Sequence, residues 1–259
     1  MAKAKYELQD GVALITLNDP ATLNAISVDM TEELTLLFDR ACDEARCIVL
    51  TGEGRGFSSG ANLASGAPPI ADDGLPDLGG RLEKTFNPFV TKLRDLPIPY
   101  VTAVNGVAAG IGCSFALLGD LIVAGESAYF LQAFRRIGLV PDGSATYHLP
   151  RMIGRARAME MMLLGEKIPA KQAFDWGLVN RCVPDADLLP TAKALARELA
   201  NGPASLGMIR RLAWASLDNS WEEQLQAERQ TQKIAGRTED CREGVTAFLQ
   251  KRPTNFKGS

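Results

Sequence analysis

The 259-residue sequence has one histidine, no closely spaced cysteine pair among its five cysteines, and no excess of positive charge. So few potential ligands exclude a multi-histidine or paired-cysteine metal site, and we expect neither a metal nor a separate cofactor. The odd number of cysteines indicates reduced thiols rather than a disulfide framework. A net charge of −3 provides no basic surface for nucleic acid.

The sequence also has little that indicates export or membrane insertion. The first six residues lack the apolar core of a secretory signal, so we expect a cytoplasmic protein. Residues 101–125 are mostly apolar and about long enough to span a bilayer. They also contain Asn105, Ser114, Asp120 and five glycines. We therefore interpret this stretch as a buried strand, turn and helix, and we expect no membrane partner.

Short apolar runs alternate with amphipathic stretches along the first two thirds of the chain. The runs predict buried strands at 12–17, 47–51, 100–104 and 121–124. Helical spacing predicts helices after the N-cap candidate Ser27, at 81–96, at 155–164 and at 169–176. The alternation predicts an α/β fold of stacked strand-and-helix units.

The composition changes after about Pro184, where helical patterns take over. These patterns predict helices at 188–200, 203–217, 221–234 and 240–251. Ser220 and Glu223 form a capping box at the start of the third. We divide the chain into a core, residues 1–190, and a helical C-terminal region, residues 191–259, which must pack on the body or on a neighbouring subunit.

The glycine-rich segment 51–60 follows a predicted strand. It is not a dinucleotide loop, because Phe57 stands where the third glycine is required. Gly-Phe-Ser-Ser-Gly at 56–60 matches the G-x-S-x-G pattern, and Ser58 and His148 occur in hydrolase order. A nucleophile elbow needs a helix directly after the serine, and residues 61–69 form a poor helix. A serine hydrolase is therefore the distant alternative.

A second glycine-bearing segment, residues 105–112, also follows a predicted strand. Ile111 would lie at the N-terminus of a small-residue helix, where free N–H groups attract negative charge. One N–H from each glycine segment, converging on a carbonyl oxygen, would form an oxyanion hole. Alternatively, the glycines only permit tight packing between layers.

Six segments carry a resemblance to a known family. They are Leu-Asn-Asp-Pro at 17–20 with Leu-Asn-Ala at 23–25, Gly-Phe-Ser-Ser-Gly-Ala-Asn-Leu at 56–63, Ala-Val-Asn-Gly-Val-Ala-Ala-Gly at 103–110, Gly-Leu-Val-Pro-Asp-Gly at 138–143, Trp-Gly-Leu-Val-Asn at 176–180 and Asn-Phe-Lys-Gly at 255–258. In this order and spacing they resemble the crotonase superfamily, the enoyl-CoA hydratase/isomerase family. The resemblance runs almost from end to end.

The resemblance implies a spiral of repeated ββα units and a C-terminal helical region that builds homotrimers, often paired into homohexamers. It also implies an acyl-CoA thioester substrate, of which coenzyme A is a part, and two backbone donors for the thioester oxygen. By motif position these donors are Ala61 and Ile111, the latter standing where the family usually has glycine. The substrate-binding residues implied are Ala25, Gly60, Asn62, Leu63, Gly110, Ser114 and Phe134.

Catalysis is where the sequence departs from the family's hydratases, which use two glutamates. Ser114 and Phe134 occupy those two positions, and neither side chain can act as a carboxyl acid or base. Asp142 stands where the isomerase and dehalogenase branches carry a catalytic aspartate. Its local sequence, Pro-Asp-Gly-Ser at 141–144, also fits a turn or a helix N-cap. An apolar pocket containing Phe134 should raise the pKa of Asp142.

We therefore predict an acyl-CoA isomerase that shifts a double bond or rearranges a ring-activated acyl group through an enolate. Asp142 would be its acid and base, and the irregular segment 64–80 would shape the acyl pocket. The alternatives in the same fold are an enoyl-CoA hydratase and an aroyl-CoA dehalogenase-type enzyme. A non-catalytic binder of CoA esters is a further alternative.

Overall fold

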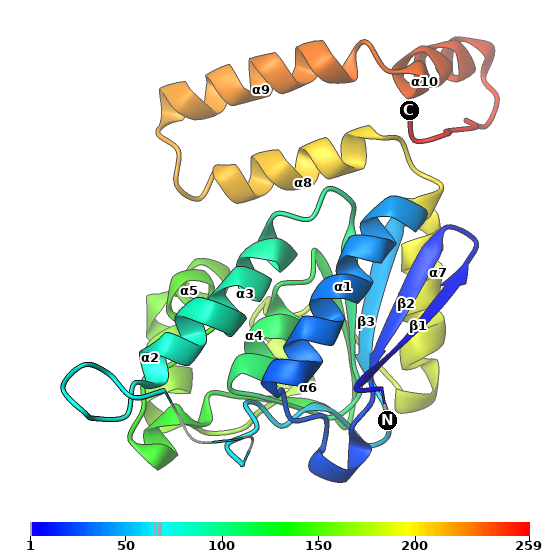
Figure 1. Cartoon of the computed structure of the whole chain (residues 1–259). Coiled ribbons are helices and arrows are strands. Elements are labelled where there is room, and N and C mark those ends of the chain that lie inside the picture. Colours follow the sequence, from blue (N-terminus) through cyan, green and yellow to red (C-terminus); the bar gives the residue numbers. More distant parts are fainter. Residues whose placement is uncertain (1, 65, 67–68) are drawn as a thin grey trace.

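A computed structural model describes residues 2–64, 66 and 69–259 and contains two sheets (Figure 1). The larger sheet has six strands in the order β1-β2-β3-β5-β7-β10. Their bounds are Ala4–Gln9, Val12–Leu17, Cys47–Gly52, Tyr100–Val104, Leu121–Gly125 and Arg181–Val183. The β1–β2 pair is antiparallel and all other pairs in this sheet are parallel. The four strands predicted from apolar runs are β2, β3, β5 and β7.

The smaller sheet has four short strands in the order β4-β6-β8-β9, at Gly56–Ser58, Val107–Ala109, Tyr129–Leu131 and Ile168–Pro169. Three of them, β4, β6 and β8, each come directly after a strand of the larger sheet and before a helix. This order repeats the ββα unit that the resemblance implied. Apolar patterning alone missed β4, β6 and β8, because three-residue strands are too short to show a period.

Ten α-helices are found in the described part of the chain. They are α1 Val28–Glu44, α2 Leu78–Arg81, α3 Asn87–Arg94, α4 Ile111–Leu117, α5 Ala145–Leu164, α6 Ala170–Asp175, α7 Leu188–Ala200, α8 Ser205–Ala215, α9 Trp221–Ala235 and α10 Glu239–Gln250. A π-helical turn, Leu82–Phe86, joins α2 to α3. None of the helices described is both long and apolar enough to cross a membrane.

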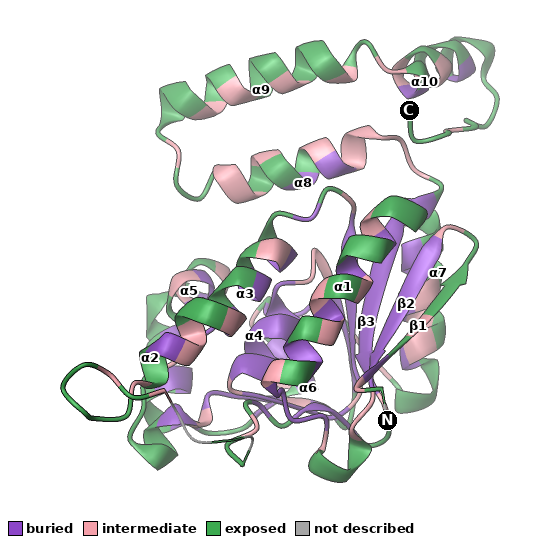
Figure 2. Ribbon diagram, viewed as in Figure 1, coloured by how far each residue is buried: buried purple, intermediate pink, exposed green. Residues whose placement is uncertain are grey.

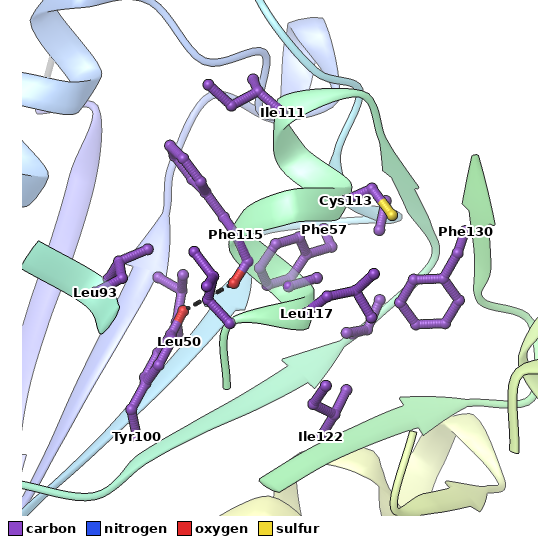
Figure 3. Close-up of a cluster of buried hydrophobic side chains, with 14 of the residues drawn as sticks. Leu50, Phe57, Leu93, Tyr100, Ile111, Cys113, Phe115, Leu117, Ile122 and Phe130 are labelled. Atoms are coloured by element: carbon purple, nitrogen blue, oxygen red, sulfur yellow. Dashed lines mark hydrogen bonds between the residues drawn. The ribbon is translucent and has the colours of Figure 1, made fainter. Parts of the chain in front are cut away.

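The main core lies between the larger sheet and helices α1, α3, α4 and α5. Phe38, Phe89, Tyr100 and Phe115 form a chain of edge-to-face aromatic contacts with ring centroids 5.0–5.6 Å apart. The buried Tyr100 hydroxyl donates to the Phe115 carbonyl at 3.2 Å (Figure 3). This core fixes α4, the helix that begins at the candidate site.

Several predicted helix boundaries differ from the structure. The helix expected at 81–96 is divided into the end of α2, the π-helical turn and α3, and the helix expected at 203–217 is the shorter α8. The helix expected at 155–164 forms the second part of α5, because the non-helical Gly154 (φ 77°) separates two helical segments there, and the first segment, which begins at Ala145 and contains Pro150, was not predicted. The helix expected at 169–176 begins at Ala170, with Pro169 at its N-cap. The end of α5, where Gly165 lies in the left-handed region, was predicted correctly.

The C-terminal helices fall into two groups. α7 packs against β2, β3, β5 and β7, forming a second apolar cluster on the other face of the larger sheet. α8 contacts the body, and α9 and α10 extend beyond it (Figure 1). The boundary predicted at residue 190 falls inside α7, and the division into two domains stays a prediction.

The segment expected to be an irregular loop, 64–80, lies partly outside the described residues, since 65, 67 and 68 are not among them. Its described part contains an isolated bridge between Ile70 and Pro76. α2 begins at Leu78, two residues before the predicted end of the loop.

Candidate active site

The two glycine segments meet at the ends of adjacent parallel strands, β4 and β6. A Cβ atom on Gly60 would lie 2.9 Å from the Ala109 carbonyl oxygen, and one on Gly110 would lie 3.9 Å from the Gly60 Cα atom. Both glycines have positive φ, 100° and 51°. The backbones therefore touch, and only residues without side chains permit this approach.

Each of the two touching glycines is followed by an amide without a backbone partner. Ile111 is the first residue of α4, so its N–H has no acceptor within the helix. Ala61 pairs with Ile26 through its neighbours: Ile26 N–H donates to the Gly60 carbonyl and Asn62 N–H donates to the Ile26 carbonyl, both at 2.8 Å. Within the described residues, the Ala61 N–H has no acceptor. Such donors on adjoining loops can stabilise a negatively charged oxygen.

Asp142 lies on a turn that packs directly against α4. A Cβ atom on Gly143 would lie 2.9 Å from Ser114 Cβ and 3.1 Å from Ile111 Cγ1. The Ser114 hydroxyl donates to the Asp142 carbonyl at 3.1 Å. The turn therefore places the Asp142 backbone one helical turn or less from the start of α4.

The Asp142 carboxyl group is half-buried, and its Oδ1 atom is fully buried without a hydrogen-bond partner. Burial raises the pKa of Asp142 from 3.8 to about 6, in the direction expected from the sequence. A carboxyl group with this pKa is mostly ionised at pH 7 and still accepts a proton readily.

Phe134 belongs to a short 3-10 helix, Ala133–Ile137, and is 8% exposed. Its ring contacts the Gly110 backbone, since a Cβ atom on Gly110 would lie 3.6 Å from Phe134 Cζ. Ser114 is completely buried in α4. The two positions at which hydratases carry glutamate therefore hold a buried phenyl ring and a buried hydroxyl, both adjoining the glycine segments.

The other predicted substrate-binding residues surround the Ile26–Ala61 bridge. Ala25 is buried and its N–H donates to Thr22 Oγ1 at 3.2 Å. Asn62 accepts the Ala64 N–H at 3.0 Å, while the Leu63 side chain is 68% exposed. The structure thus places Asn62 and Leu63 on the same loop as Ala61, with Leu63 facing solvent, and Ala25 on the segment that pairs with this loop.

The geometry of Ser58 contradicts the serine-hydrolase alternative. Ser58 is completely buried, and its hydroxyl donates to the Asn24 carbonyl at 2.8 Å. His148 Nδ1 instead lies 3.0 Å from the Ser144 hydroxyl, and no helix follows β4 directly. A buried hydroxyl that is already donating to a carbonyl cannot serve as a nucleophile.

The Ser144–His148 pair was not found by sequence analysis. The Asp-Gly-Ser turn at the start of a helix was the available signal, but no helix was predicted at 145–153. Among the residues described, no group of three or more His, Cys, Asp and Glu side chains is placed to hold a metal ion.

Comparisons with known proteins agree with this architecture. The family described as Enoyl-CoA hydratase/isomerase matches residues 7–259. A "Probable enoyl-CoA hydratase" of Rhodobacter capsulatus is 44% identical over 98% of this chain and 97% of its own length. The "1,2-epoxyphenylacetyl-CoA isomerase" of Escherichia coli is also 44% identical, over 97% of both chains.

Solved structures resemble the whole chain as well. A "putative enoyl-CoA hydratase" from Streptomyces coelicolor superposes with a TM-score of 0.91 at 33% identity, covering 99% of this chain and 94% of its own. Sequence and structure therefore agree over nearly the full length. The chain belongs to the enoyl-CoA hydratase/isomerase family, within the crotonase superfamily.

Proposed function

We propose that the protein is an acyl-CoA isomerase in which Asp142 is the acid and base and the Ala61 and Ile111 amides hold the thioester oxygen. One observation carries this proposal above all. The half-buried Asp142 carboxyl, whose Oδ1 atom is buried without a partner, lies on a turn that packs against the start of α4, while serine and phenylalanine replace both glutamates that a hydratase of the family would use.

The simplest reaction for this arrangement is a 1,3-proton shift in a 3-enoyl-CoA. The Asp142 carboxylate takes a proton from C2, and the electron pair moves into the thioester to form a dienolate. The two amides stabilise the negative oxygen that develops. The same carboxyl then returns its proton to C4, which yields the 2-enoyl-CoA and regenerates the carboxylate. The burial that raises the pKa of Asp142 to about 6 brings it close to the range in which one group performs both steps.

The rearrangement of a ring-activated acyl-CoA needs the same two elements, an acid and base beside a held thioester oxygen. The Escherichia coli relative named 1,2-epoxyphenylacetyl-CoA isomerase supports this class of substrate. The Rhodobacter capsulatus relative named a probable hydratase supports the alternative of hydration. The buried Ser114 and Phe134 favour isomerisation, because neither can activate water or supply a proton to the acyl chain.

We also propose that the chain assembles as a homotrimer or homohexamer through its C-terminal helices. α9 has no buried residues, and large apolar side chains on α9 and α10 are exposed, among them Trp221 (74%) and Phe248 (83%). Exposed apolar side chains of this size are typical of surfaces that pack against another subunit.

The decisive test is a panel of 3-enoyl-, 2-enoyl- and aryl-CoA esters incubated with enzyme in heavy water and analysed by mass spectrometry. Isomerisation would convert the 3-enoyl ester to the 2-enoyl ester and incorporate deuterium when the proton on Asp142 exchanges with solvent before its return. Hydration would add one molecule of heavy water, and hydrolysis would release free coenzyme A. We expect Asp142→Asn to slow deuterium incorporation by about 10²–10⁴-fold while leaving acyl-CoA affinity nearly unchanged.

The matched control is Asp43→Asn, which removes an exposed carboxylate on α1. This variant should exchange deuterium as the wild type does. Exchange that persists in Asp142→Asn would remove Asp142 from the mechanism. Binding of the whole panel without turnover would indicate a CoA-ester binder instead of an enzyme.

A further inference from the structure

The turn that carries Asp142 has an unusual backbone. Gly143 and Ser144 both lie in the left-handed region, with φ of 58° and 68°. Glycine adopts this conformation freely, but serine does so at a cost, because its Cβ atom crowds the backbone. A non-glycine residue held there beside a candidate catalytic group indicates that surrounding contacts impose the conformation.

Ser144 is the N-cap of α5, but its side chain does not cap the helix. Its hydroxyl instead shares a hydrogen bond with His148 Nδ1 at 3.0 Å. The backbone N–H of His148 also donates to the Ser144 carbonyl at 3.0 Å. Ser144 is therefore tied at both its side chain and its backbone to a residue one helical turn further along.

His148 itself is poorly placed to react with a substrate. It is 2% exposed, and its Nε2 atom is buried without a hydrogen-bond partner. Burial also lowers the pKa of His148 to about 4, so the imidazole is neutral at pH 7. A neutral, enclosed ring whose Nδ1 faces Ser144 is suited to holding that side chain in place.

Ser114 holds the same turn from α4. Its buried hydroxyl donates to the Asp142 carbonyl, and the Gly143 backbone packs against its Cβ atom. The side chain found at the first hydratase glutamate position therefore contacts the Asp142 backbone.

We propose that Ser144 and His148 form a positioning pair that fixes the left-handed turn and so sets the direction of the Asp142 carboxyl, with Ser114 securing the turn from the opposite side. This inference rests on the proposed function, in which Asp142 transfers the proton. None of the three residues is assigned a chemical step. They act on the reaction only through the placement of Asp142.

The test compares His148→Leu with His148→Asn, using isomerisation of 3-hexenoyl-CoA as the assay. Leucine fills the space without a polar atom, whereas the asparagine Oδ1 atom can occupy the place of Nδ1 and accept from Ser144. We expect His148→Leu to lower kcat about 10–100-fold with KM within about 2-fold, because small misplacement of a catalytic group is costly. We expect His148→Asn to restore kcat to within about 3-fold of the wild type.

A double-mutant cycle sharpens the test. If the two residues act as a pair, Ser144→Ala should lower kcat as much as His148→Leu, and the double variant should fall no further. Ile153→Val, a conservative change at a buried position of α5, controls for loss of packing. It should lower the melting temperature without changing kcat.

Several results would overturn the positioning pair. They are wild-type kcat in His148→Leu, equal losses in the leucine and asparagine variants, fully multiplicative losses in the double variant, or an effect confined to KM. Deuterium exchange in Asp142→Asn separates these failures from that of the proposed function. If that exchange is lost while His148→Leu remains fully active, Asp142 is catalytic and only the positioning pair is wrong.

Discussion

The body of the molecule and its C-terminal helices are held together by different means. Every residue of β2, β3 and β5 is buried, whereas α9 has no buried residue (Figure 2). The body folds around a large apolar core, which is the main source of stability in globular domains. Helices α8, α9 and α10 bury few side chains. Each polar contact that holds them therefore contributes a larger part of the free energy that keeps them in place.

Two buried ionic side chains contribute such contacts, one between α8 and the body and one within the C-terminal region. Arg210 on α8 is 6% exposed and pairs with Asp120 at 2.8 Å, while its guanidinium also donates to the carbonyls of Leu93, Arg94 and Leu96. Asp240 on α10 is 2% exposed and accepts backbone N–H groups. The body is thus stabilised by many interchangeable apolar contacts, and the C-terminal layer by a few specific ones.

Substitution of Arg210 should therefore cause the largest loss of stability. Arg210→Ala leaves the Asp120 carboxylate and three carbonyls without their buried partner, which should lower the free energy of unfolding by about 3–5 kcal/mol. Hydrogen exchange should show α8 losing protection before β3 and β5. Arg211→Ala, at the exposed neighbouring position, is the control and should change little. Equal losses of protection in α8 and the larger sheet would contradict the separation of the two regions.

The next effect is at Asp240, whose carboxylate accepts the N–H groups of Ala204, Lys257 and Gly258 at 2.6–2.9 Å. Asp240→Ala leaves these donors unpaired, and we expect a loss of about 2–3 kcal/mol. Limited proteolysis should then cut the C-terminal segment after α10 first. Glu239→Ala, the exposed neighbour, should leave the cleavage pattern unchanged.

Asp142→Asn should change the stability in the opposite direction, because the half-buried Asp142 carboxylate has one oxygen, Oδ1, that is buried without a hydrogen-bond partner. Its pKa is about 6 when folded and near 3.8 when unfolded, so its contribution is full at low pH and is lost as the pH rises through 6. Because the group is partly exposed, Asp142→Asn should stabilise the protein by about 2 kcal/mol at pH 8 and by less at pH 4.5. His148 is present in both the wild type and Asp142→Asn, so its titration cancels when the stabilities of the two proteins are subtracted. A pH-independent difference in melting temperature would argue against the raised pKa.

The smallest effect compares two helix caps of the same kind. Ser27 caps α1 on the main core, and Ser220 caps α9 with a capping box, as the sequence predicted for both. Ser27→Ala should cost about 1 kcal/mol of global stability. Ser220→Ala should cost less than about 0.5 kcal/mol globally, since an end without buried contacts frays locally. Calorimetry with hydrogen exchange of α9 would measure both, and equal global losses would show that α9 folds with the body.

The sequence predicted the parts of the fold that repeat a strong local pattern. The bounds of β2, β5 and α7 match the predicted ranges, because continuous apolar runs and clear amphipathic spacing leave little choice. The first part of α5 was missed, since Pro150 and the non-helical Gly154 leave only a short, interrupted pattern before the helical segment predicted at 155–164.

For the candidate site, motif position identified Ala61, Ile111 and Asp142 as candidate catalytic residues, and their roles stay a proposal. Nothing in the sequence shows that Gly60 and Gly110 touch, because they are fifty residues apart and meet only when β4 and β6 pair. The same holds for Ser114 and Asp142, which lie on α4 and on the turn before α5.

By itself, then, the sequence determined the long strands of the larger sheet and most of the longer helices, the family, and the absence of both hydratase glutamates, since these depend on local periodicity, on motifs in a fixed order and on residue type. Only the tertiary structure decided that Gly60 and Gly110 touch, that the Asp142 Oδ1 atom is buried without a hydrogen-bond partner, and that the Ser144 side chain is hydrogen-bonded to His148 rather than capping its helix. Burial and hydrogen-bond partners depend on segments distant in the chain, and no local pattern contains that information.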